Sequence, residues 1–196
     1  MRSDPGASRV PGSSVVLVAV LCLIAPAPSF AWTIIEKTLA FVNKKPILLS
    51  DVELTRALMG IDAPQALERT IEESLMFEDA IRLVNEPPGE AALEGAIATL
   101  QARAGSPSSR AAFLRKARVQ LAISNYIDVR LRALVRVEDV EVRRVFNEMV
   151  ATQNPATVFD AVSHEIRAAL ERKCLDQKIE EWVKALRARA EIRRVP

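Results

Sequence analysis

Few residues of this sequence can do acid–base, nucleophilic or metal chemistry, and their spacing does not bring them together. The chain has 1 histidine, His164, which excludes metal sites with several imidazole ligands and mechanisms that use two imidazoles. His164 follows Ser163 in a stretch with helical periodicity, and adjacent side chains on a helix do not face each other. Adjacent carboxylates such as Glu72-Glu73 and Glu180-Glu181 lie in charged helical stretches, where we expect a solvated surface. The sequence therefore predicts no catalytic residues and a protein that is not an enzyme.

Motifs that bind cofactors or metals are also absent from the sequence. It contains no P-loop, no GxGxxG, no GxSxG and no HExxH. We therefore expect no cofactor and no metal. The charges nearly cancel, with 27 Lys+Arg against 25 Asp+Glu and a net charge of +2, which argues against nucleic acid as a partner.

Residues 1–31 have the pattern of a secretory signal peptide. A basic start is followed by an apolar run over 15–25, which is too short for the roughly 20 residues that span a membrane. Ser29 and Ala31 are the small residues expected before a cleavage site after Ala31. The pattern predicts export and no stable membrane insertion, with an uncleaved N-terminal anchor as the alternative.

Cleavage after residue 31 would leave a single cysteine, Cys174, because Cys22 lies in the apolar run. An internal disulfide is then impossible. Cys174 lies in a strongly helical stretch, and two interpretations stay open. It is either a half-buried small apolar residue or the site of a disulfide to a second chain.

The apolar pattern predicts a mainly α fold: a helical core with a small N-terminal β-hairpin, and a C-terminal helix plus a short strand that pack back on it. Residues 34–49 have the pattern of a hairpin that turns at 43–45, and Pro46 confines the returning strand to an edge because proline lacks an N–H. A short strand is expected over 191–195, so that the two ends could meet in one sheet. Three helices are expected in the first half: one at 50–60, one from 62 to about 84, and a third that ends at Gly105. Three more are expected after it, from Ser106 to about Arg136, from about Val137 to Met149, and from Phe159 to Ala190.

Two helix starts carry local capping signals. Ser50-Asp51-Val52-Glu53 has the sequence of a capping box, in which Ser50 and Glu53 satisfy each other's backbone N–H groups. Asp62, before Ala63-Pro64, is expected to cap the next helix with its carboxylate. The helix from Ser106 is expected to bury one apolar stripe: Phe113, Ala117, Leu121, Ile127, Leu131 and Leu134.

The segment 39–52 (LAFVNKKPILLSDV) resembles the opening of the SurA-type periplasmic chaperones, where an AxVN…I…SD hairpin leads into the first helix. The helices that follow, and the C-terminal helix and strand over 159–195, are similar in order to those of the same family. The resemblance covers nearly all of the chain after residue 31. Between Met149 and Phe159 the family usually carries one or two parvulin-type isomerase modules, but this sequence has only about nine residues there.

The resemblance implies three parts after the signal peptide. These are a helical SurA N-terminal-like domain at 32–150, a linker at 151–158 in place of the parvulin module, and a helix and strand at 159–196 that complete the same core. It also implies a periplasmic, ATP-independent chaperone without isomerase activity. The stretch 105–118 is shorter than the family's usual helix pair, so the family's peptide crevice is not transferred in detail.

Such a chaperone binds unfolded exported or outer-membrane polypeptides in an apolar groove that stays partly open, and Met- or aromatic-lined walls favour promiscuous binding. The candidates for this peptide-binding groove are Met76, Phe77, Phe113, Leu114 and Tyr126. Each of these side chains would equally fit plain core packing. A second hypothesis is a non-catalytic assembly subunit that docks on one dedicated envelope partner through its C-terminal helix.

Overall fold

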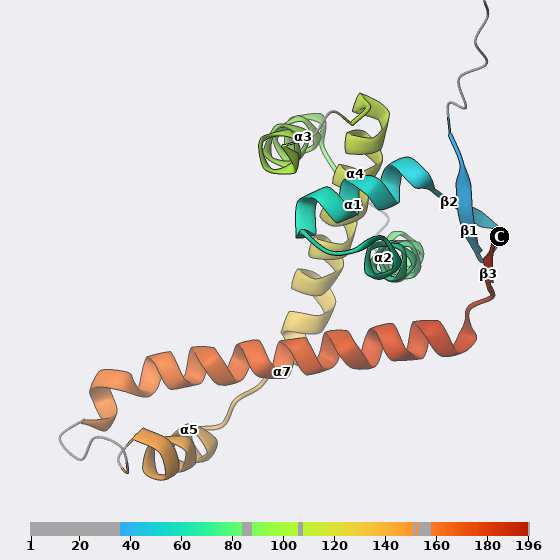
Figure 1. Cartoon of the computed structure of the whole chain (residues 1–196). Coiled ribbons are helices and arrows are strands. Elements are labelled where there is room, and N and C mark those ends of the chain that lie inside the picture. The colour runs from blue at the N-terminus through green and yellow to red at the C-terminus, as the bar shows by residue number, and fades with distance from the viewer. Residues whose placement is uncertain (1–35, 84–87, 106–107, 151, 153–157, 196) are drawn as a thin grey trace, which may run out of the picture. The chain divides into compact units, whose positions relative to one another are not determined.

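The structure is a computed structural model that describes residues 36–83, 88–105, 108–150, 152 and 158–195. The predicted signal peptide, Val84 and most of the predicted linker at 151–158 lie outside the described residues. As the sequence predicts, the fold is mainly helical with a small antiparallel sheet formed by segments from the two ends of the described chain (Figure 1).

The sheet has the strand order β2-β1-β3, and β1 (Thr38–Val42) pairs antiparallel with both neighbours. Its turn is Asn43-Lys44, with φ values of 47° and 73°, and positive φ at both positions is the geometry of the tight turns that match strand twist. Lys45 therefore begins β2 (Lys45–Leu48) rather than belonging to the turn. The predicted edge position of Pro46 and the meeting of the two ends, through β3 (Ile192–Arg194), are confirmed.

The two caps have different outcomes. At the start of α2 (Ala63–Leu83), the Asp62 carboxylate accepts a 2.8 Å hydrogen bond from the backbone N–H of Gln65, so that cap is confirmed. The predicted capping box is wrong, because α1 (Leu49–Met59) begins before Ser50 and has no side-chain cap. The Ser50 hydroxyl instead donates to the Glu36 carboxylate at 2.7 Å, which is a stronger acceptor than the amide that the local pattern assigns to it.

The next two helices pack against each other and on α1. Helix α3 (Glu90–Ala104) ends at Gly105, which has φ 58° as a C-cap, and α4 (Arg110–Tyr126) begins at Ser109, whose hydroxyl accepts from the N–H of Ala112. The chain then continues as a π-helical turn, η1 (Ile127–Leu131), and a short 3₁₀ turn, η2 (Arg132–Leu134). This change of helical pitch rotates the apolar stripe, so Leu134 is 63% exposed instead of buried as predicted.

The C-terminal half contains a short helix and a long one that pack together. Helix α5 (Asp139–Val145) continues into η3 (Phe146–Val150), and both contact α7 (Phe159–Arg189). Helix α7 also contacts η1 and α2 before the chain returns to the sheet as β3 (Figure 1). On α7, Ile166 and Leu186 are buried, whereas Ala169 is exposed.

The buried apolar residues form three clusters. The first joins the sheet, α1, α2 and α7, and its buried members include Val42, Ile71 and Leu186. The second lies among α1, α3 and α4, and the third joins Ala80, Tyr126 and Leu131 at the junction of α2, α4 and η1. Residues from the first and last elements therefore share one core.

Candidate functional site

A cleft of about 300 Å³ opens where β2, α1, α2 and α4 meet, and we call it the β2–α4 cleft. A small site that combines apolar walls with a few converging polar groups is the usual form of a binding site. The residues that line it are Lys45, Pro46, Ile47, Asp51, Thr55, Thr70, Glu73, Ser74, Phe77, Arg115, Lys116, Arg118 and Val119.

The apolar wall of the cleft is built from β2 and from facing positions of α2 and α4. Ile47 is buried at the edge strand, and its neighbour Pro46 contributes its ring. Phe77 and Val119 are half-buried, and Phe77 belongs to none of the three buried clusters. The Lys45 ammonium lies 5.9 Å from the centroid of the Phe77 ring. Phe77 is therefore an aromatic side chain held at the cleft and not in the core.

The floor of the cleft contains a buried ion pair. The Lys116 ammonium lies 2.5 Å from a Glu73 carboxylate oxygen, and the two side chains are 6% and 11% exposed. Lys116 also donates a 2.9 Å hydrogen bond to the hydroxyl of Thr55, which in turn donates to the Asp51 carbonyl at 2.9 Å. The two opposite charges and these hydrogen bonds offset the cost of burying both side chains. This arrangement ties α1, α2 and α4 together beneath the cleft.

One rim of the cleft is a second charged cluster, in which Arg115 joins α4 to the start of α1. Its guanidinium lies 2.8 Å from an Asp51 oxygen and also donates to the Ser50 hydroxyl at 2.8 Å. Burial raises the pKa of Asp51, and the hydrogen bond and charge of Arg115 oppose this rise. For Glu36, slight burial is outweighed by hydrogen bonds from Ser50 and by the charge of Arg115, so its pKa is lowered.

Arg118 also lines the cleft; it is exposed and lies on α4 three residues after Arg115. Within the described part of the chain, its guanidinium has no carboxylate within ion-pair distance and no hydrogen-bond partner. Lys45, on β2, is engaged by Glu78 at 3.1 Å. Arg118 is therefore the cation of the cleft that remains open to a ligand.

The five predicted peptide-binding residues do not lie in one groove. Met76, Phe113 and Tyr126 are buried, each in a different core cluster, and Leu114 packs beside Phe113. Phe77 is the member of the set that lines the β2–α4 cleft. The other four residues contribute to core packing in this fold, which is the alternative that the sequence left open.

The sequence does not identify the charged residues of the cleft, and its prediction of a solvated Glu73 is wrong. We expected Glu73 on a solvated helix surface, but it is 8% exposed because α4 brings Lys116 against it. The sequence carries one signal of this: Lys116 lies between Phe113 and Ala117 in an apolar stripe, where a charge needs a buried partner. His164 and the Glu180-Glu181 pair are exposed as predicted.

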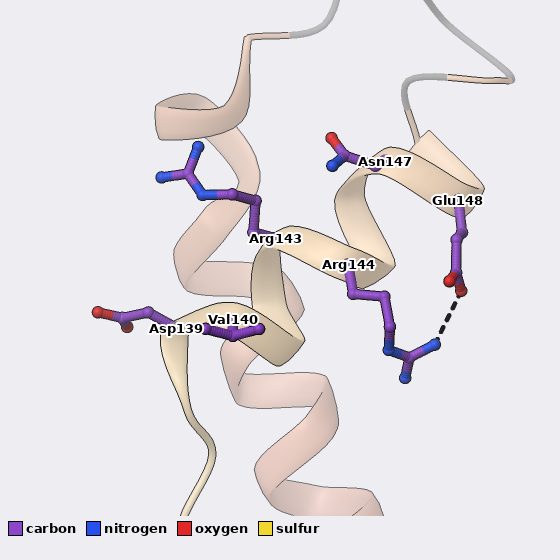
Figure 2. A pocket seen from close by; sticks show the side chains of 6 residues that line it. All are labelled: Asp139, Val140, Arg143, Arg144, Asn147 and Glu148. Atoms are coloured by element: carbon purple, nitrogen blue, oxygen red, sulfur yellow. Dashed lines mark hydrogen bonds and ion pairs between the residues drawn. The ribbon is translucent and has the colours of Figure 1, made fainter.

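Another hollow in the described residues does not bring polar groups from several elements together beside an apolar wall, as the β2–α4 cleft does. It has a volume of about 450 Å³ and is lined by Asp139, Val140, Arg143, Arg144, Asn147 and Glu148, all from α5 and η3. Figure 2 shows that Arg144 points toward Glu148, its ion-pair partner at 2.8 Å, whereas Arg143 and Asp139 point away from that pair. The side chains spread from one short helical segment, so they form no common site.

A larger hollow, of about 700 Å³, lies between α7 and the segment that contains α5. Its lining mixes apolar side chains such as Val145 and Ile166 with charges of both signs, including Lys173 and Glu141. Cys174 also lines it and is half-buried with a free thiol, in agreement with the first interpretation of this residue. A disulfide from Cys174 to a second chain stays a prediction.

Neither a metal site nor a membrane span is found in the described residues. No group of three or more His, Cys, Asp or Glu side chains among them could hold a metal ion. Within the same residues, every helix is too short or too polar to cross a membrane. Comparison of the sequence with models of known protein families and with curated proteins gives no match.

Proposed function

We propose that this protein is an ATP-independent periplasmic chaperone of the SurA type, without isomerase activity, and that the β2–α4 cleft holds apolar side chains of unfolded exported polypeptides. The observation that carries the proposal is the placement of Phe77. This aromatic side chain is held outside the three buried clusters and forms the cleft wall with Ile47 and Val119. An apolar side chain that enters such a wall contributes about 1.5–3 kcal/mol before ordering costs.

The edge strand beside the cleft limits how an extended chain can bind there. Within the described residues, β2 has β1 on one side and no strand on the other. Pro46 lies in the middle of β2 and cannot donate a backbone hydrogen bond, which discourages long strand addition at this edge. Side-chain burial in the cleft would then supply most of the affinity, and such binding tolerates many client sequences.

Export is the part of this proposal that rests on residues 1–31. We expect the protein in the periplasmic fraction, with Trp32 as its first residue. Intact-mass measurement of the purified protein tests both the cleavage and its position. A protein that keeps residues 1–31 and stays with the membrane would instead support the uncleaved anchor.

Suppression of aggregation tests the chaperone activity. The protein at stoichiometric ratio, without ATP, should slow the aggregation of a urea-denatured outer-membrane protein on dilution. Phe77→Ser should lose most of this effect, because it removes the aromatic wall without opening a core cluster. Ile81→Ser is the matched control, since Ile81 lies on the same helix, is 41% exposed and does not line the cleft. If the unmodified protein has no effect, the chaperone proposal is wrong; if Phe77→Ser keeps full activity, the cleft is not the binding site.

A specific feature of α7 favours the second candidate, an assembly subunit with one dedicated partner. Among the 31 residues of this helix only Ile166 and Leu186 are buried, and positions such as His164, Ala169 and Arg172 are exposed and could dock a partner. Val158, just before the helix, is 66% exposed. Co-purification from a periplasmic extract separates the two functions. A dedicated subunit should retain one protein at near-equal amount, whereas a chaperone should retain many clients in small amounts.

A further inference from the structure

More cations than carboxylates line the β2–α4 cleft. Four cationic side chains line it, Lys45, Arg115, Lys116 and Arg118, but only two carboxylates, Asp51 and Glu73. Both carboxylates are already paired, Asp51 with Arg115 and Glu73 with Lys116. The remaining positive charge therefore lies at the mouth of the cleft.

Of the two cations at the mouth, Lys45 and Arg118, only Arg118 is open to a new partner. Lys45 is tied to Glu78 and lies over the Phe77 ring. Arg118 has no ion-pair or hydrogen-bond partner among the described residues, and it shares the α4 side of the cleft with the apolar Val119. A guanidinium next to apolar side chains suits a ligand with a carboxylate beside an apolar group, because its two parallel N–H groups match a carboxylate.

We propose that the β2–α4 cleft selects client segments that present a carboxylate next to an apolar side chain, with Arg118 receiving the carboxylate and Phe77 and Val119 receiving the apolar group. This inference rests on the proposed chaperone function and adds a charge preference to it. The carboxylate can come from an acidic side chain or from the end of a client chain, since both present the same group. The contribution of Arg118 should weaken with added salt, because it lies at an exposed rim.

Fluorescence anisotropy with three matched peptides tests this preference. The first is a fluorescein-labelled Gly-Ser peptide that ends in Leu-Leu with a free carboxylate, and the second is the same peptide as its amide. The third has the amide end and an Asp before the two leucines. We expect the first, the third or both to bind about three- to tenfold more tightly than the amide peptide, which corresponds to one partly exposed charged hydrogen bond. Which of the two gains affinity identifies the source of the carboxylate.

Two variants assign the effect to Arg118. Arg118→Gln should remove the advantage of the carboxylate peptides and leave the Kd of the amide peptide unchanged. Arg103→Gln, which removes an exposed arginine of α3 outside the cleft, should behave as the unmodified protein does. Urea unfolding of all three proteins should coincide, because both arginines are exposed.

The possible failures are distinguishable. If all three peptides bind with one Kd and Phe77→Ser weakens all of them, the cleft binds apolar segments but the carboxylate preference is wrong. If inorganic phosphate displaces the carboxylate peptides at low millimolar concentration, Arg118 serves a general anion site, and the inference is also overturned. If no peptide binds and aggregation is not slowed, both the preference and the proposed function fail.

Discussion

Lys116 and Glu73 form a charged pair that is buried beneath the cleft, and this makes the loss of either partner costly. Their side chains are 6% and 11% exposed, and the ammonium has one further partner, the Thr55 hydroxyl. We expect Lys116→Met to destabilise the protein by about 3 kcal/mol, because Glu73 would stay buried with only the more distant Arg69, 3.7 Å away, as its compensating charge. Urea unfolding at neutral pH measures the loss.

The double variant Lys116→Met/Glu73→Leu separates the cost of an orphaned charge from the value of the pair. Replacing both partners by apolar groups of similar size is often nearly neutral, so the double variant should recover most of the lost free energy. A double variant that is as unstable as Lys116→Met would contradict this explanation. It would mean that the methionine itself, through poor packing, causes the loss.

Residue-scale prediction from the sequence works where the partner is local and fails where it is distant. The Asp62 cap is readable because its partner, the N–H of Gln65, lies three positions on. Ser50 instead bonds to Glu36 and Arg115, and the latter lies 65 positions away. Of the candidate site, Phe77 is recoverable from its type and pattern, whereas Arg118 becomes a candidate only when the fold shows which cations already have partners.

At the scale of elements, Glu68 links α2 to both C-terminal elements. Its carboxylate lies 3.0 Å from Arg187 on α7 and 2.5 Å from Arg194 on β3. Its slight burial is outweighed by the hydrogen bonds and charges of these two arginines, so its pKa lies below the ordinary value of 4.5. A lowered pKa in the folded state means that the ionised carboxylate stabilises the fold.

Glu68→Gln should therefore lower the free energy of unfolding at neutral pH, and the difference from the unmodified protein should vanish in acid. The contribution of Glu68 is complete above pH 4.5 and is lost as the pH falls through the lower folded-state pKa. Urea unfolding at a series of pH values measures this difference. Glu165 is exposed on α7 and has no ion pair among the described residues. Glu165→Gln should therefore show no loss of unfolding free energy at neutral pH that vanishes in acid. A Glu68→Gln difference that persists at low pH would exclude the ion pairs as its cause.

Element boundaries follow from the sequence where one residue type decides them. Gly60 and Gly105 end α1 and α3 with positive φ, and the hairpin and the C-terminal strand are found as expected. The segment 127–134 is different, since its residues suit a regular helix and nothing local announces the π and 3₁₀ turns. A change of hydrogen-bond register of this kind is set by packing against neighbouring elements, which a single-sequence pattern does not contain.

At the scale of the whole molecule, Asp79 connects the N-terminal helices to the end of α7. This buried carboxylate accepts hydrogen bonds from the indole N–H of Trp182 at 2.9 Å and from Arg189 at 2.8 Å. The Trp182 ring stacks on Tyr126, with centroids 4.3 Å apart and an angle of 18° between the planes. Residues more than 100 positions apart thus meet in one polar and aromatic contact.

Asp79→Ala should weaken this connection in two measurable ways. We expect a loss of about 1–3 kcal/mol in urea unfolding followed by circular dichroism, because the indole N–H would be left without its partner.

The chain has 1 tyrosine, so alkaline titration by absorbance reports Tyr126 alone. Burial raises the pKa of Tyr126 above 10.0, and the negative charge of Asp79 raises it further. Asp79→Ala should bring this titration closer to the ordinary value, whereas a variant that only loosens packing elsewhere, such as Leu100→Ala in the second cluster, should not. An unchanged Tyr126 titration in Asp79→Ala would contradict the effect of the Asp79 charge on Tyr126.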